Sequence, residues 1–394
     1  MWAIRSKKGS FDSWRDDGMS VAHLSASACG SKPESERQRI MTMKLPRAPG
    51  SLAPQAVSRR SFLKGSGMAA GAALLPAGLI SATPALAADK VVHQLGWVKS
   101  IQFGGHFAAI ENGYFADEGI EADFLAGGPS GIGTDVAVAT GQATTSDTDV
   151  DGTIRARING MPVKAFAAIM QKAPGAIMSL AESPIKTLAD IPGKTIALPD
   201  GVRPQVNALL EANGFDPANV TYVPVGTDPG ILAAGQVDGY YGWATNQGVM
   251  LQTRGVDIAI AYMNDLGVPG YAGVLIATDE TLDERKDLIV RWLRAEIKGW
   301  QWHLDNPDEM ARLMVDMYGQ RGLDLEAQMV ESNMMKDFLP VGAAKEHGLL
   351  WIEPDAFEAG LAFNVAAGAM AEGDLTVADV MTQDLIREAH NTLT

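Results

Sequence analysis

The feature that most constrains the fold of this chain is the repeated alternation of short strand-like runs with helix-like stretches. Val163 to Met170 is apolar except for Lys164, as expected of a parallel strand covered by helices on both faces. Four shorter runs of the same kind follow, at residues 195–198, 220–225, 258–262 and 274–277. Strands that alternate with helical segments indicate βαβ units, so we predict an α/β fold with a mainly parallel sheet.

The first 87 residues predict an export signal and not a part of the fold. Paired arginines at 59 and 60 are followed by an apolar pair, and residues 65–86 carry no charge. A small-x-small pattern ends at Ala87 and predicts cleavage after that residue. Paired arginines in this context resemble the twin-arginine class of export signals. We therefore expect a periplasmic protein from which the leader, residues 1–87, is removed.

Removal of this leader changes the composition of the chain. The leader carries 12 Lys and Arg against 5 Asp and Glu, so the mature chain has 307 residues and a formal net charge of −22 instead of −15. The single cysteine, Cys29, is also lost, which excludes disulfides and thiolate chemistry from the mature protein. A chain this acidic disfavours nucleic acid as a partner. Its length suffices for two lobes with separate cores.

Several segments, in a fixed order, resemble one known family. Residues 94–97 read QLGW, residues 104–115 read GGHFAAIENGYF, and residues 116–122 read ADEGIEA. The pattern resumes with SPIKTLADIPGKTI at 183–196 and LAAGQVDG at 232–239. Together these segments resemble the solute-binding proteins that capture sulfonates, nitrate or thiamine-precursor pyrimidines for ABC importers. Their order and spacing carry the resemblance, since no single motif does.

The resemblance implies a type II periplasmic-binding-protein architecture with two α/β lobes, two hinge crossings and C-terminal helices. The crossings are expected near residues 176–180 and 271–275. The first lobe then comprises residues 88–177 and the return 273–394, and the second lobe residues 178–272. The family also implies a small-molecule ligand captured by hinge closure and an ABC permease in the inner membrane as partner. We expect a monomer without a cofactor.

Loops that follow the predicted strands are the expected ligand contacts, because ligands of open α/β sheets bind at the carboxyl ends of the strands. Trp97 closes the first strand and offers a flat stacking face. Gln102 and His106 follow it and offer hydrogen bonds. For His106, a histidine satisfied inside the core is an equally good interpretation.

Two further loops of the first lobe supply candidate contacts. Gly128 and Ser130 belong to a glycine-rich turn whose backbone amides can approach a polar or anionic group. Ser146 and Asp149 belong to a polar cluster, for which a turn or a helix cap is the alternative interpretation. Tyr271, at the second predicted crossing, completes the set.

The second lobe contributes an aromatic segment. Tyr241 and Trp243 alternate along a predicted strand and so share one face, with Tyr240 on the other. Asn246 follows and adds a neutral amide, which is unusual in a core strand. Arg203 opens a predicted helix and could hold an anion, although a surface arginine is an equal alternative.

These residues favour a flat, neutral, heteroaromatic ligand such as a thiamine-precursor pyrimidine. The alternative is a small anion such as an alkanesulfonate, taurine or nitrate, held by glycine-loop amides and Arg203. The mature chain has no H-x-x-x-H or H-E-x-x-H metal spacing, no G-x-S-x-G elbow and no phosphate loop. We therefore predict neither catalytic nor metal-binding residues. An exported cofactor enzyme and a sensor module without transport are the remaining classes.

Overall fold

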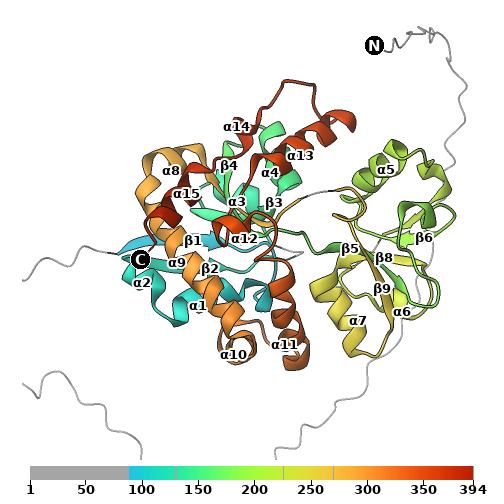
Figure 1. The fold of residues 1–394 in the computed structure, drawn as a ribbon, viewed down its shortest axis with the longest axis horizontal. Helices are drawn as coiled ribbons and strands as arrows, with labels where there is room; N and C mark the ends of the chain where they lie inside the picture. Colours follow the sequence, from blue (N-terminus) through green and yellow to red (C-terminus); the bar gives the residue numbers. More distant parts are fainter. Residues whose placement is uncertain (1–87, 129–130, 225, 269, 394) are drawn as a thin grey trace, which may run out of the picture. The chain divides into compact units, whose positions relative to one another are not determined.

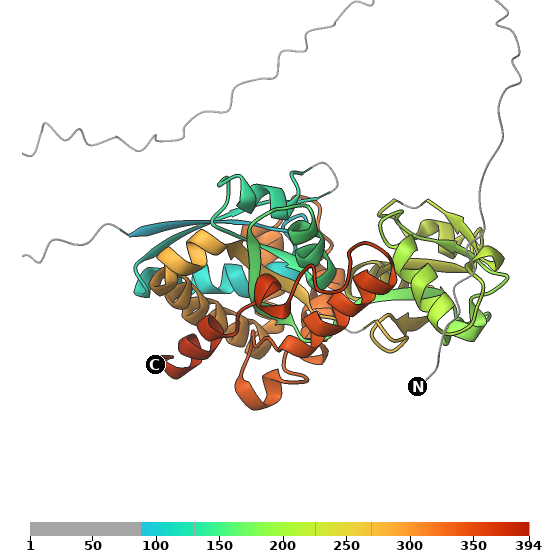
Figure 2. The same cartoon turned by 90° about the horizontal axis from the view of Figure 1, so that it is seen from above.

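The computed structural model describes residues 88–128, 131–224, 226–268 and 270–393, and the predicted export leader lies outside them. This part of the chain folds into two five-stranded sheets, each with its own helices (Figures 1 and 2). Two sheets, each flanked by helices, are the two-lobed α/β architecture that the sequence predicts. No helix of these residues is both long enough and apolar enough to cross a membrane.

The first sheet has the strand order β2-β1-β3-β10-β4. Its strands are β1 (Asp89–Gln94), β2 (Ile120–Leu125), β3 (Thr145–Asp149), β4 (Val163–Met170) and β10 (Ala272–Thr278). β1 pairs in parallel with β2 and β3, whereas β10 is antiparallel to both of its neighbours, β3 and β4. Four of the five strands therefore run the same way, as predicted.

The second sheet repeats this plan with the order β7-β6-β8-β5-β9. Its strands are β5 (Gly175–Leu180), β6 (Thr195–Ala197), β7 (Thr221–Val223), β8 (Gly239–Trp243) and β9 (Ile258–Tyr262). The antiparallel strand is β5. In each sheet the antiparallel strand, β10 or β5, is the first strand after the chain crosses from the other sheet.

The chain changes sheets at two places. The first crossing is residues 171–174, between β4 and β5, and the second is residues 263–271, between β9 and β10. Each crossing precedes the segment that the sequence indicated, because those apolar segments are interior strands of the sheets. We propose the lobe boundaries at these crossings, with residues 175–262 as the second lobe.

Helices cover both sheets. The first lobe contains α1 (Gly104–Glu111), α2 (Tyr114–Asp117), α3 (Thr134–Ala139) and α4 (Val150–Ile158), and the second contains α5 (Arg203–Ala212), α6 (Gly230–Ala233) and α7 (Val249–Thr253). The C-terminal helices are α8 (Asp279–Glu284), α9 (Lys286–Asp305), α10 (Pro307–Leu313), α11 (Leu325–Met334), α12 (Ala344–His347), α13 (Pro354–Ala366), α14 (Val377–Val380) and α15 (Asp384–Asn391) (Figure 1).

Two glycines allow α1 and α9 to pack closely. A Cβ atom on Gly105 would overlap the indole ring of Trp300, and one on Gly299 would overlap the carbonyl oxygen of Gly105. Trp300 itself is fully buried in the core of the first lobe, and so is Trp292. The tryptophans of α9 at these positions therefore fix the helix against the first lobe.

Candidate ligand-binding site

A cavity of about 640 Å³ is lined by loops that follow strands of both sheets. This volume lies in the range of small-molecule sites. Its described lining includes the aromatic residues Trp97, Tyr240, Tyr241 and Trp243, the amides Gln102, Asn246 and Gln247, the threonines Thr134, Thr148 and Thr227, and the carboxylates Asp147 and Asp149. The carboxyl ends of strands β1, β3, β7 and β8 supply most of them.

The wall formed by the loop after β1 depends on a glycine and an aspartate. The backbone N–H of Gly96 donates to both carboxylate oxygens of Asp147, at 3.0 and 3.1 Å. A Cβ atom on Gly96 would lie 2.7 Å from the same carboxylate. The close approach of backbone and carboxylate therefore needs glycine here, and it places Asp147 beside Trp97 in the cavity wall.

The glycine-rich turn after β2 supports this loop. The N–H of Gly127 donates to the carbonyl oxygen of Trp97 at 2.8 Å, and a Cβ atom on Gly127 would overlap the carbonyl oxygen of Leu95. Gly128 has φ +126°, a conformation that favours glycine, and it lines the cavity. Ser130 lies outside the described residues.

Strand β8 and the turn after it form the wall of the second lobe. Tyr240 and Tyr241 project to opposite faces of the sheet, into different apolar clusters, as the alternation of the strand predicts. The hydroxyl of Tyr240 donates to the carbonyl oxygen of Gly226 at 2.9 Å. Burial raises the pKa of Tyr241 to about 12, so its hydroxyl remains a hydrogen-bond donor at neutral pH.

A π-helical turn, η4 (Ala244–Gly248), continues from β8 and presents two amides. The side-chain oxygen of Gln247 accepts a hydrogen bond from the N–H of Trp243 at 2.8 Å, which fixes this amide. Gln247 and Asn246 both line the cavity. An irregular turn of this kind turns consecutive side chains toward one site, which is a common arrangement at functional positions.

The charged groups of the cavity wall are acidic. Asp147 and Asp149 are the ionisable carboxylates among the described lining residues, which include no lysine, arginine or histidine. Asp149 also caps α4, because its side chain accepts a hydrogen bond from the N–H of Gly152 at 2.6 Å. Asp149 is therefore both a helix cap, as the alternative interpretation of this cluster predicts, and a part of the cavity lining.

Four of the predicted contacts lie away from the cavity lining. The hydroxyl of Ser146 donates to the carbonyl oxygen of Thr134 at 3.0 Å and is fully buried. The guanidinium of Arg203 lies over the ring of Tyr222, at 5.1 Å from its centroid. The hydroxyl of Tyr271 accepts a hydrogen bond from the N–H of Glu353 at 3.2 Å.

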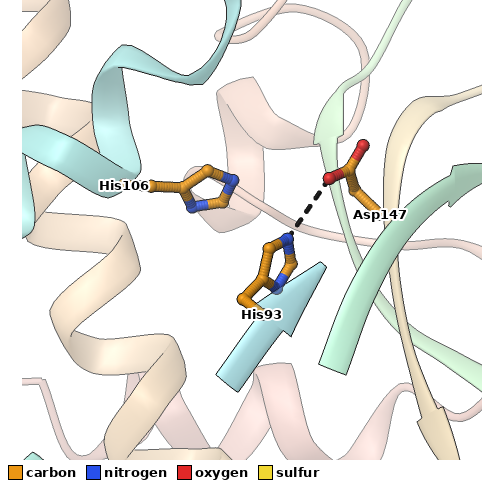
Figure 3. A group of neighbouring side chains, drawn as sticks. All are labelled: His93, His106 and Asp147. Atoms are coloured by element: carbon orange, nitrogen blue, oxygen red, sulfur yellow. Dashed lines mark hydrogen bonds and ion pairs between the residues drawn. The ribbon is translucent and has the colours of Figure 1, made fainter. Parts of the chain in front are cut away.

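His106 is the fourth, and it belongs to a buried cluster behind the wall. Its Nδ1 atom lies 2.7 Å from the carboxylate of Glu296. The imidazole of His93 lies beside it, with Nδ1 at 2.9 Å from the hydroxyl of Thr145 and Nε2 at 3.2 Å from Oδ1 of Asp147. Figure 3 shows both rings and the carboxylate of Asp147 directed toward one another.

The structure thus brings together most of the predicted set, namely Trp97, Gln102, Gly128, Asp149, Tyr241, Trp243 and Asn246. The sequence interpretation included Asp147 in the polar cluster but not among the predicted contacts, although it shares a face of β3 with Asp149 at a spacing of two residues. It also passed over Thr227, although this residue follows β7 and the strand-like run predicted at residues 220–225. The carboxyl-end rule would have indicated both.

Comparison with known proteins gives the family. Residues 100–310 match the family described as NMT1/THI5 like, and residues 56–76 match the twin-arginine translocation pathway signal sequence. The formylaminopyrimidine-binding protein of Halalkalibacterium halodurans is 28% identical over 256 residues, which cover 63% of this chain and 76% of that protein. The riboflavin-binding protein RibY of Chloroflexus aurantiacus is 27% identical over 304 residues, covering 72% and 85%.

A solved structure supports the fold. The putative periplasmic sulfonate-binding protein SsuA of Methylobacillus flagellatus superimposes with a TM-score of 0.58 at 16% identity, covering 78% of this chain and 95% of that one. The family match spans more than half of the chain, and the export signal precedes it. This chain belongs to the NMT1/THI5-like family and is an exported, periplasmic substrate-binding protein of an ABC importer.

Proposed function

We propose that this protein captures a flat heteroaromatic molecule of the aminopyrimidine kind, neutral or cationic, and delivers it to its permease. One observation carries the proposal. The cavity has four aromatic side chains in its described lining and no lysine, arginine or histidine. Aromatic faces bind flat rings by stacking, whereas a buried anion needs cationic or multiple N–H partners.

The distribution of the aromatic residues supports capture by closure of the lobes. Trp97 belongs to the first lobe, and Tyr241 and Trp243 belong to the second. A ring bound between these faces would contact both lobes at once, so its binding energy would favour the closed state. The two chain crossings, 171–174 and 263–271, are the segments that would bend.

The polar groups of the wall suit the amines and ring nitrogens of such a ligand. Carboxylates accept hydrogen bonds only, so Asp147 and Asp149 match exocyclic amino groups. The amides of Gln102 and Asn246 can donate as well as accept, which matches ring nitrogens and carbonyl oxygens. The two curated relatives are named for binding a formylaminopyrimidine and a riboflavin, and both of these ligands contain nitrogen heterocycles.

We also propose that the protein binds its ligand without chemical change and acts as a monomer. The described lining contains no cysteine, serine, histidine or lysine, so it offers no serine or cysteine nucleophile paired with an imidazole or amine base. The acidic surface of the mature chain disfavours nucleic acid as a partner.

The test compares two variants by titration calorimetry with a formylaminopyrimidine, riboflavin and taurine. Trp243→Ala removes a ring from the cavity and is expected to weaken heterocycle binding by about tenfold to a hundredfold, the usual cost of losing one stacking face. Arg203→Ala is the matched control, since its guanidinium lies over Tyr222 outside the lining, and it should leave binding unchanged. Tight binding of taurine that depends on Arg203, with no binding of heterocycles, would contradict the proposal.

A further inference from the structure

The buried cluster behind the cavity wall has the composition of a metal site. His93 of β1, His106 of α1 and Asp147 of β3 each offer one ligand atom, and these atoms lie within 4.8 Å of one another. Figure 3 shows the three side chains converging from their separate elements. We propose that these residues bind one divalent transition-metal ion of the zinc class. This inference does not depend on the identity of the organic ligand.

The strongest support is a nitrogen atom without a partner. Nε2 of His106 is buried and has no hydrogen-bond partner among the described residues. A buried imidazole nitrogen in this state is costly unless something binds it. It lies on the side of the ring that faces His93 and Asp147 (Figure 3). An ion bound between the three side chains would therefore be coordinated by the lone pair of this nitrogen.

The Nδ1 side of the His106 ring has the second partner that metal-binding histidines commonly have. The carboxylate of Glu296 lies 2.7 and 2.8 Å from Nδ1 of His106, and both side chains are fully buried. A carboxylate at Nδ1 holds the proton there, so in the neutral ring the lone pair is on Nε2. Histidines that bind metals commonly have this second partner, which orients the ring and raises its basicity.

Charge balance also favours a divalent ion. Asp147 and Glu296 place two carboxylates in the core, and their hydrogen-bond and ion-pair partners among the described residues are histidines and the N–H of Gly96. Neither carboxylate pairs with a lysine or arginine of these residues. One divalent ion bound to two neutral imidazoles would balance the negative charges of both carboxylates. This matters because uncompensated buried charge is strongly destabilising.

The donor set selects the type of ion. Two imidazole nitrogens and one carboxylate oxygen, with a fourth position open, suit zinc and similar ions rather than calcium or magnesium. The 3.2 Å between Nε2 of His93 and Oδ1 of Asp147 matches the separation of about 3.4 Å between tetrahedral zinc ligands. Metal binding would bring the ligand atom of His106 closer to those of His93 and Asp147, by up to about 1.5 Å.

Aromatic rings enclose the histidines and would keep the site dry. Phe124 and Trp300 lie 5.0 and 5.5 Å from the ring of His106, and Trp292 is stacked on His93 at 5.9 Å. Asp147 alone also lines the cavity, so an ion could enter along this carboxylate. An apolar shell of this kind strengthens the interaction between an ion and its ligands.

The experiment uses the mature protein, exported to the periplasm and purified without a polyhistidine tag. Elemental analysis by mass spectrometry counts bound metal in the isolated protein. Samples treated with a chelator are then titrated with Co²⁺, whose visible bands report tetrahedral coordination. The variants are His106→Gln and Glu296→Gln, and the control is His347→Gln, an exposed histidine outside the cluster. Circular dichroism and unfolding without metal verify the fold of each variant.

We expect about one equivalent of zinc-class metal per chain, and a tetrahedral cobalt spectrum in the wild type and in His347→Gln. His106→Gln should abolish both signals, and Glu296→Gln should weaken metal affinity by about tenfold to a hundredfold. If His106→Gln does not fold, the Glu296→Gln variant carries the test alone. Absence of metal and of a cobalt spectrum in the wild type would overturn the proposal, as would equal binding by wild type and the folded variants.

Discussion

Glu331 of α11 provides a direct test of how this fold tolerates a buried acid. The side chain is 1% exposed, and its Oε1 atom has no hydrogen-bond partner among the described residues. Burial raises the pKa of Glu331 to about 8, although the side chains of Asn246 and Gln328 partly oppose the shift. The carboxyl is therefore mostly protonated at neutral pH, and Glu331→Gln mimics this neutral form with an amide of nearly the same shape.

The sign of the effect follows from proton linkage. The unfolded chain releases this proton near its ordinary pKa of 4.5, whereas the folded chain holds it up to about pH 8. The contribution of Glu331 to stability is therefore complete below pH 4.5 and is lost as the pH rises through 8. One pKa unit corresponds to about 1.4 kcal/mol, so a shift from 4.5 to about 8 makes the full loss on the order of 5 kcal/mol.

The assay is urea unfolding of wild type and Glu331→Gln at pH 5, 7 and 9. The two proteins share every other titrating group, so the difference between them isolates Glu331. We expect free energies of unfolding within about 1 kcal/mol at pH 5, and a variant more stable by roughly 4 kcal/mol at pH 9. Glu326→Gln, an exposed change on the same helix, is the control and should show no such trend. A difference between wild type and Glu331→Gln that is constant across this pH range would refute the reasoning.

Two further predictions concern α1, α9 and their neighbours. Gly105→Ala should lower the free energy of unfolding by about 1–3 kcal/mol, because the new methyl group overlaps Trp300, whereas Gly201→Ala, with open space around it, should change it little; chemical denaturation measures both. Burial lowers the pKa of His303 to about 3, so its contribution to stability is complete above pH 6.5 and is lost as the pH falls toward 3. His303→Gln should flatten the acid side of the unfolding profile measured from pH 7 to 4, and an unchanged slope would contradict the assignment.

The sequence predicted the lobes and the aromatic walls of the cavity because both depend on local patterns. An apolar strand followed by a loop is visible in the chain itself, so Trp97, Tyr241 and Trp243 could be identified from the carboxyl-end rule. Neither the orientation of Arg203 nor that of Tyr271 is local. Each is set by a partner from another element, Tyr222 in the first case and the backbone of Glu353 in the second.

In strand β3, a shift of one residue decides whether a side chain faces the cavity. Ser146 and Asp147 are adjacent, but successive side chains of a strand project to opposite faces. Ser146 turns to the carbonyl oxygen of Thr134, and Asp147 turns to Gly96 and the cavity. The sequence marked the whole cluster as polar without a register that would separate the two faces. That register comes from the pairing of β3 with β1 and β10, which the local pattern does not contain.

Asp147 belongs to both the cavity wall and the buried cluster, and this double membership has an energetic consequence. Its Oδ1 atom already accepts from Gly96 and interacts with Nε2 of His93, while Oδ2 accepts only the longer bond from Gly96. A carboxylate offers about four acceptor positions, so Oδ2 retains capacity for a donor in the cavity. Any change of charge at His93 therefore alters the carboxylate that the ligand would meet. If a metal ion in the buried cluster changes the affinity for a ligand at Asp147, the ligand changes the affinity of the cluster for the metal by the same factor. Titrating ligand with and without Co²⁺ measures that factor from both sides, and equal affinities would show that the two sites are independent.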